Sequence, residues 1–188
     1  MALLLFNKPY LVSCQFSAHS RHETLADYVK VPNVYPAGRL DADSEGLVLL
    51  TDDGALQHVI SHPSKKQPKT YIVQVEGEVS ESALLSLQNP LDLGDFVTRP
   101  CEAKLIHAPD WLWDRNPPIR ARINHPTSWL ALTLQEGKNR QVRRMTAAVG
   151  IPTLRLIRIA IGPYSLQENP LWPGEWTEVP ASLLKRPS

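Results

Sequence analysis

The pattern of apolar and polar positions along the chain predicts more strands than helices. Short apolar or alternating runs bounded by turn residues are typical of buried and half-buried strands, and they occur at 3–6, 47–50, 70–77, 97–107, 128–135, 153–161 and 175–179. Helical spacing with start or stop signals predicts helices over 24–30, 55–61, 81–89 and 140–149. Because the strands outnumber the helices and do not strictly alternate with them, we expect an α+β fold with a mixed, mostly antiparallel sheet.

One segment, 108–126, fits no regular element. It contains four prolines together with Trp111 and Trp113. A long irregular loop inside a compact domain is often functional, although an insertion without a function explains it nearly as well.

Composition narrows the class of protein but does not reveal its partner. The 188 residues suffice for one domain or two small lobes. The net charge is only +1, from 20 basic against 19 acidic residues, so any nucleic-acid surface must come from local clustering. Cys14 and Cys101 lack a paired spacing, which indicates free thiols in a reducing compartment. The apolar stretch at 1–6 is too short for a signal peptide or membrane span, so we expect a cytoplasmic protein.

An acidic loop precedes the apolar run at 47–50. Between two glycines, seven positions hold four charged residues: Arg39, Asp41, Asp43 and Glu45. A loop held by a buried strand is a common place for chemistry, and a solvated polar turn is an equal alternative. A calcium loop is a weaker one. Its ligand positions fit Asp41, Asp43, Glu45 and Asp52, but an apolar run fills the positions between and no helix leads in.

A basic cluster occupies the start of the helix expected at 140–149. Lys138, Arg140, Arg143 and Arg144 place four cations in seven residues. On a helix that starts near Asn139, Arg140 and Arg144 would share a face. Clustered like charges repel each other, so an anionic partner that presents phosphate groups is expected, with a solvated basic face as an equal alternative. Further cations that could extend this surface are Lys65, Lys66, Lys69, Arg155 and Arg158.

Tyr71 lies near the start of the alternating strand at 70–77, directly after Lys69 and Thr70. A single tyrosine on a strand usually packs into a core, but a flipped base also needs a flat aromatic ring to lie against. The residues alone leave both interpretations open.

Four motifs, in order, resemble one family, the A-type family of bacterial small-subunit pseudouridine synthases. GRLDADSEGLVLLTDDG resembles their catalytic motif, KTYIVQVEG their tyrosine motif, and EGKNRQVRRM and LRLIRIAIGPYSL their third motif and its extension. The resemblance spans residue 3 to about 179. Many relatives carry an N-terminal RNA-binding S4 domain. This chain starts at the first catalytic strand, so we expect a single catalytic domain, 1–188, of two closely packed lobes without an S4 domain.

The resemblance implies a fold with flanking helices and a central cleft, and the isomerisation of uridine to pseudouridine in RNA. Asp41 matches the essential aspartate. The residues alone do not distinguish Asp41 from Asp43. Arg143 matches the basic residue paired with that aspartate, and Tyr71 the tyrosine stacked on the target base. Leu156 matches the leucine under the base, and Arg39 the arginine that fills the gap left by the flipped base.

The remaining expectations join the basic cluster to this resemblance, although Arg140 stands where many relatives have His. RNA contacts are expected from Lys138, Arg140, Arg144 and Arg158. No metal or organic cofactor is implied, because substrate and product are isomers. Segments of the 108–126 loop and its flank resemble family members that act on the large ribosomal subunit, so the expected partner of this monomer is 23S rRNA or a large-subunit precursor. Trp111, Trp113 and Arg120 are expected to help choose that RNA. The alternative is a catalytically inactive RNA-binding or ribosome-assembly protein on the same fold.

Overall fold

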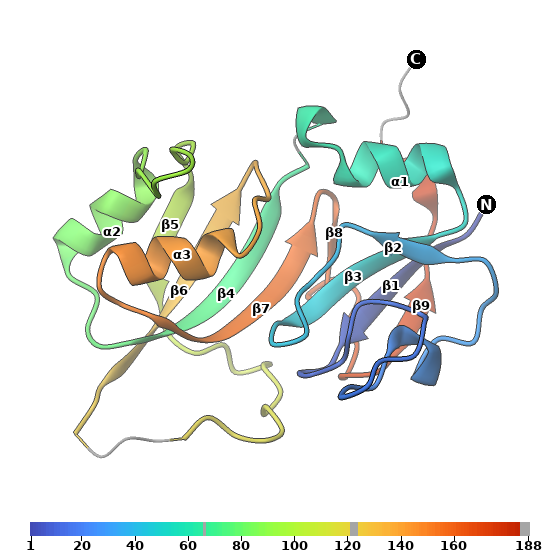
Figure 1. The fold of residues 1–188 in the computed structure, drawn as a ribbon, viewed down its shortest axis with the longest axis horizontal. Helices are drawn as coiled ribbons and strands as arrows, with labels where there is room; N and C mark the ends of the chain where they lie inside the picture. The colour runs from blue at the N-terminus through green and yellow to red at the C-terminus, as the bar shows by residue number, and fades with distance from the viewer. Residues whose placement is uncertain (66, 121–123, 185–188) are drawn as a thin grey trace. The chain divides into compact units, whose positions relative to one another are not determined.

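The computed structural model describes residues 1–65, 67–120 and 124–184 (Figure 1). Its strands are β1 (Leu3–Lys8), β2 (Tyr35–Ala37), β3 (Glu45–Thr51), β4 (Lys69–Glu76), β5 (Glu102–Ile106), β6 (Thr127–Leu134), β7 (Thr153–Ile161), β8 (Tyr164–Ser165) and β9 (Trp176–Glu178). Its α-helices are α1 (Gly54–Ser61), α2 (Glu81–Gln88) and α3 (Gln141–Ala148), and single 3₁₀ turns lie at Leu25–Asp27, Pro63–Lys65 and Ala181–Leu183. This is the expected α+β class.

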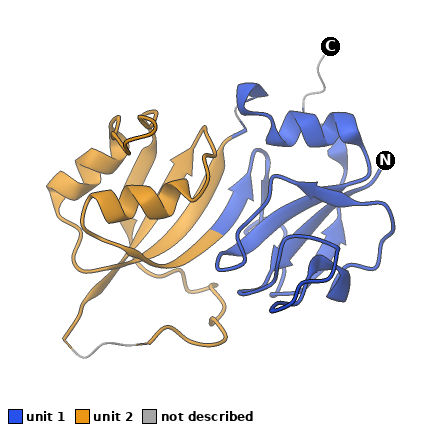
Figure 2. Cartoon of the chain, in the orientation of Figure 1, with its two compact units in different colours: residues 1–67, 158–188 blue, residues 68–157 orange. Residues whose placement is uncertain are grey.

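The chain divides into two compact units (Figure 2). The first unit holds residues 1–67 and 158–188, and the second holds 68–157. Strand β7 is shared, since its first five residues belong to the second unit and its last four to the first. The expected central cleft stays a prediction.

The first unit is built on two fully buried strands. β1 and β3 pair antiparallel from Leu3 opposite Thr51 to Lys8 opposite Gly46, and every residue of both is buried. The strand order is β7-β3-β1-β9, with β2 also on β3 and β8 on β7. One face of the β1–β3 pair packs into a core cluster: Leu4, Phe6, Cys14, Leu25, Val29, Val34, Leu40, Val48 and Leu50. Two buried central strands give this unit a rigid frame for the loop that enters β3.

The second unit is an antiparallel sheet covered by helices, in the strand order β5-β6-β4-β7. β4 and β6 pair along their whole length, from Lys69 opposite Leu134 to Glu76 opposite Thr127. Alternation along β4 turns Tyr71, Val73 and Val75 toward one face. There α2 and α3 bury Leu87, Val142 and Met145 in the same cluster, as the helices over the sheet in Figure 1 show.

Two expected elements are shorter in the structure, for local reasons. The helix predicted at 24–30 is only the 3₁₀ turn Leu25–Asp27, whose capping box uses Thr24 and Asp27; a segment this short cannot offset helix nucleation. The strand predicted at 97–107 is only Glu102–Ile106. Thr98 instead exchanges two hydrogen bonds of 2.9 Å with Leu91. The short strands β2 and β8 were not predicted.

The 108–126 segment has no helix or strand among its described residues, as predicted. No described helix is both long enough and apolar enough to cross a membrane.

Candidate functional site

The Asp41 loop, residues 38–45, is a fixed turn in the first unit. The Ser44 N–H donates to the Asp41 carbonyl oxygen at 3.0 Å, and the Leu11 N–H donates to the Ala42 carbonyl oxygen at 2.7 Å. Leu40 anchors the loop in the core cluster, while Asp41 is only half-buried. This geometry favours a positioned carboxylate over the alternative of a solvated turn.

Lys8 holds the loop from one side. Its ammonium is fully buried, and Nζ donates to three carbonyl oxygens, those of Pro9 (2.8 Å), Val12 (2.8 Å) and Ala42 (3.2 Å). Burial lowers the pKa of Lys8 to about 8, although the neighbouring negative groups act in the opposite direction; these are Cys14, Glu45, Asp43 and Asp41. Lys8 was not among the expected site residues.

Arg158 holds the same loop from β7. The residue is 3% exposed, and its guanidinium donates to three backbone carbonyl oxygens. These belong to Leu47 (from Nε, 2.9 Å), Gly38 (from Nη2, 3.1 Å) and Arg39 (from Nη1, 3.5 Å). The expected contact between Arg158 and RNA stays a prediction, but the contacts observed are those of a residue that holds the loop. The Arg39 side chain is exposed.

The calcium interpretation is wrong. Asp52 would have to join Asp41 around one ion, but the seven residues of β3, from Glu45 to Thr51, lie between Asp41 and Asp52. An extended strand of that length spans about 20 Å, whereas calcium ligands lie about 2.5 Å from the ion. Among residues 1–65, 67–120 and 124–184, no group of three or more His, Cys, Asp or Glu side chains could hold a metal ion.

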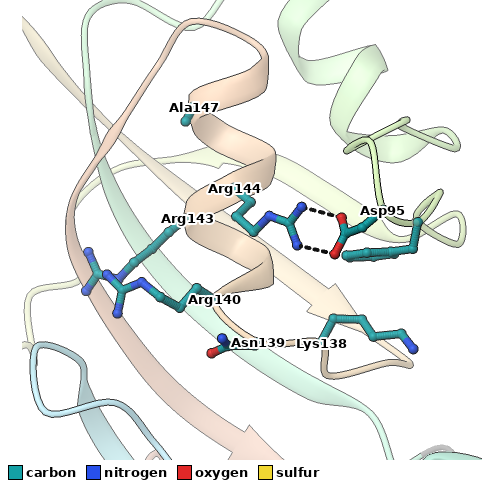
Figure 3. Close-up of a pocket in the computed structure, with 8 residues that line it drawn as sticks. Asp95, Lys138, Asn139, Arg140, Arg143, Arg144 and Ala147 are labelled. Atoms are coloured by element: carbon teal, nitrogen blue, oxygen red, sulfur yellow. Dashed lines mark hydrogen bonds and ion pairs between the residues drawn. The ribbon is translucent and has the colours of Figure 1, made fainter.

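The basic cluster lies at the start of α3, in the second unit, and its geometry differs from the prediction. Arg140 is not helical. It precedes α3 in the left-handed region, with φ of 52°. Its side chain therefore points in a different direction from that of a residue in helical conformation. The Arg140 side chain lies beside that of Arg143, while Arg144 points toward Asp95 (Figure 3). The predicted shared face of Arg140 and Arg144 is wrong.

Buried Gln141 braces this turn. Its Oε1 accepts from the Lys138 N–H at 3.1 Å, and its Nε2 donates to Glu136 Oε1 at 2.8 Å. Glu136 also accepts from the Arg99 N–H at 3.0 Å. The exposed cations Lys138 and Arg140 are thus carried on a fixed backbone.

A basic pocket of about 670 Å³ opens beside α3 (Figure 3). Its lining contains the whole basic cluster and one aromatic ring: Asp95, Phe96, Lys138, Asn139, Arg140, Arg143, Arg144 and Ala147. Lys138 Nζ lies 5.8 Å and Arg144 Cζ 5.3 Å from the centre of the Phe96 ring. The pocket joins cations to an aromatic surface, which is the combination that suits a nucleotide.

Asp95 pairs with Arg144 inside this pocket. Both carboxylate oxygens accept from the guanidinium, and Arg144 Nη2 also donates to the Leu93 carbonyl oxygen at 3.0 Å. The hydrogen bond from Arg144 is the main cause that lowers the pKa of Asp95. Asp95 and Phe96 were not predicted as site residues, because they lie in an irregular loop far from α3 in the chain and no sequence spacing connects them to α3.

Tyr71 and Leu156 are both associated with the core cluster of the second unit. Leu156 is buried in the cluster with Val142 and Met145 of α3, and half-buried Tyr71 packs against that cluster. The structure therefore brings both residues to the helix that carries Arg143.

The other expected cations have varied surroundings. Arg155 is 7% exposed, and its Nη2 donates to the carbonyl oxygen of buried Trp113 at 2.8 Å. Lys65 is exposed in a 3₁₀ turn and Lys69 begins β4. Lys66 lies outside the described residues.

Comparison with known proteins shows which family this chain resembles. Residues 2–148 match the family model described as RNA pseudouridylate synthase. Two relatives are called ribosomal large subunit pseudouridine synthase E. The Vibrio vulnificus protein is 51% identical over 177 residues, which cover 94% of this chain and 74% of the relative. The Xanthomonas campestris pv. campestris protein is 53% identical over 176 residues, which cover 93% of both chains.

Solved structures with a similar fold agree with this family assignment. The crystal structure of a pseudouridylate synthase matches with a TM-score of 0.78 at 30% identity, over 98% of this chain and 73% of that one. An archaeal box H/ACA Nop10–Cbf5 complex matches with a TM-score of 0.60 at 12% identity, over 89% of this chain and 50% of that one, a likeness of fold alone.

The fold is thus that of the RNA-modifying isomerases that make pseudouridine. The chain belongs to the RNA pseudouridylate synthase family. The finer expectation, the A-type family of small-subunit synthases, is not supported, because the two relatives carry large-subunit names.

Proposed function

We propose that this protein is a pseudouridine synthase of the E type that isomerises a uridine in 23S rRNA, free or in a large-subunit precursor. Relatives with more than half of their residues identical over nine-tenths of the chain carry that name. The observation that carries the proposal is the Asp41 loop, a half-buried carboxylate in a turn fixed by two buried cations. We further propose that the two units act as one catalytic domain, as a monomer.

Asp41 acts first in the proposed reaction. Its ionised carboxylate attacks or stabilises the uridine while the bond between N1 of uracil and C1′ of ribose breaks. The freed uracil rotates, and its C5 forms the new bond to C1′. The proton on C5 is then lost and N1 gains a proton, so that substrate and product are isomers and no cofactor is required.

The remaining roles follow the motif positions. Tyr71 stacks on the target base and is the candidate for removing the C5 proton. Leu156 supports the base from the same hydrophobic cluster. Arg143 is proposed to pair with Asp41 and to aim its carboxylate, while Arg39 fills the gap that the flipped base leaves.

RNA is held by positive charge. Lys138 and Arg140 are exposed beside the basic pocket, and Arg144 lines it. Phosphate contacts from such residues position RNA without reading its sequence. Selection of the target is proposed to involve exposed Trp111 and Arg120 of the 108–126 loop.

A binding protein without activity is the competing function. The test is tritium release from uridine labelled at C5 in unmodified 23S rRNA or its precursor particles, because the reaction must expel the hydrogen at C5. RNA labelled at C6 is the control and should keep its label. Release confined to C5 supports the synthase, whereas tight binding with no release from any of these substrates supports the binding protein.

A further inference from the structure

The Asp41 loop is clamped on both sides by buried cations. Arg158 donates to the carbonyl oxygens of Gly38 and Arg39, just before Asp41. Lys8 donates to that of Ala42, just after it. Both cations direct every described side-chain hydrogen bond to backbone carbonyl oxygens, and both are at most 3% exposed.

We propose that Arg158 is a positioning residue, which fixes Asp41 for catalysis by holding the backbone of the Asp41 loop. The inference rests on the proposed function, because it assigns to Arg158 an effect on the step that Asp41 performs. This positioning role replaces the expected contact between Arg158 and RNA phosphate. A side chain that is only 3% exposed has almost no free surface for such a contact.

The backbone beside the loop supports this role. Gly46, the residue after the loop, has φ of +107°, and a Cβ atom there would lie 2.2 Å from the Arg158 carbonyl oxygen. The main chains of β3 and β7 therefore approach closely at this point. Arg158 holds the loop by its side chain, while its own backbone lies against Gly46, the residue that follows the loop.

Arginine suits this task better than lysine. Its planar guanidinium presents five N–H donors in a fixed fork, whereas an ammonium is a compact point charge on a flexible stem. The three carbonyl oxygens of Leu47, Gly38 and Arg39 are reached from three different nitrogen atoms of Arg158. Substitution by lysine keeps the charge and loses this arrangement.

Small displacements of a catalytic group have large kinetic effects. A shift of about 1 Å can cost about a hundredfold in rate. A loosened Asp41 loop should therefore slow the chemical step and leave RNA binding nearly unchanged.

The experiment compares wild type, Arg158→Lys and Arg158→Gln, which keeps two N–H donors without the charge. Tyr164→Phe is the matched control, since it removes a hydrogen bond that another buried side chain of the first unit donates to a backbone carbonyl oxygen, that of Pro180, at 2.6 Å. Three quantities are measured: the single-turnover rate of tritium release at saturating enzyme, the dissociation constant for the RNA, and amide hydrogen exchange of residues 38–45 without RNA.

We expect Arg158→Lys to lower the single-turnover rate about tenfold or more, with the dissociation constant within about threefold of wild type and faster exchange in 38–45. The control should keep its rate within about twofold. An unchanged rate, unchanged exchange, or a loss confined to the dissociation constant would overturn the proposal. Wild type that releases no tritium would instead refute the proposed function, and the exchange data would still decide whether Arg158 holds the loop. If Arg158→Lys does not fold, Arg158→Gln decides.

Discussion

Lys8 illustrates how a single residue can be read wrongly from the sequence. Next to Asn7 and Pro9 it looks like the polar end of a strand, yet it is fully buried. Burying a charged group is costly unless it is hydrogen-bonded, and three carbonyl oxygens satisfy it here. Two of these come from nearby residues, and the third comes from the Asp41 loop, a contact that no local pattern reveals.

The lowered pKa of Lys8 predicts a pH dependence of stability. The ordinary value of 10.5 in the unfolded chain lies above the folded value of about 8, so the unfolded chain binds more protons between these pH values. The contribution of Lys8 to the free energy of unfolding should therefore rise with pH across this window, by about 3 kcal/mol in total. Below about pH 7, where Lys8 is protonated in both states, this contribution should be constant.

Denaturant unfolding of wild type and Lys8→Met from pH 7 to 10.5 tests this. The difference in free energy of unfolding between wild type and Lys8→Met removes the contributions of other groups. One such group is Cys101, whose pKa is raised to about 11 by burial. A difference that is flat, or that falls with pH, would contradict the account.

At the scale of elements, β4 and α3 were each predicted to within one residue at both ends, but the conformation of the residue that precedes α3 was not predicted. Alternation over 70–77 placed Tyr71, Val73 and Val75 on one face, and the structure buries that face. The start of α3 was placed one residue early, at Arg140, because nothing in EGKNRQVRRM signals a left-handed residue. That conformation follows from the bracing of the turn by Gln141 and Glu136.

The arginines of β7 show a second limit of sequence patterns. LRLIRIAI suggests two cations for an anionic partner, but Arg155 and Arg158 are both buried. Their acceptors, carbonyl oxygens of Trp113 and of the Asp41 loop, lie far away in the chain. Burial of an arginine depends on such distant acceptors, so a local pattern could not distinguish these residues from surface cations.

Arg140→Gly should separate RNA binding from stability. Glycine adopts the left-handed conformation without strain, so stability should stay the same or rise by up to about 1 kcal/mol. RNA affinity should fall several-fold, and the salt slope of binding should decrease in magnitude by about 0.7 to 0.9 if Arg140 contacts one phosphate.

Lys104→Ala is the control for net charge, because Lys104 is exposed on β5 and outside the basic pocket. Filter binding over a range of salt concentrations measures both variants. An equal loss in the two would mean that Arg140 acts only through overall charge.

At the scale of the whole molecule, a net charge of +1 conceals local concentration of charge. The basic cluster lines one pocket. The 108–126 loop contains two tryptophans that differ in exposure. Trp113 is 7% exposed and tied to Arg155, whereas Trp111 is 41% exposed. The sequence assigned both tryptophans to RNA selection, but only Trp111 has the surface to stack on a base.

Trp111→Ala should therefore weaken RNA binding about tenfold, since stacking of a base on an aromatic side chain is worth about 1–3 kcal/mol. Its melting temperature should stay close to that of wild type. Trp172→Ala is the matched control, because Trp172 is 68% exposed and lies outside this loop. Equal affinities of Trp111→Ala and the control would exclude Trp111 from RNA binding.

The most direct test of the account is single-turnover tritium release from C5-labelled 23S rRNA by wild type, Asp41→Asn and Asp43→Asn. The two aspartates flank Ala42 in the same turn and are both half-buried, so they form a matched pair. The account predicts that Asp41→Asn abolishes release while it still folds and binds RNA, because only Asp41 supplies the carboxylate. Asp43→Asn should retain release. Release by Asp41→Asn, or its loss in Asp43→Asn alone, would contradict the assignment of the catalytic residue.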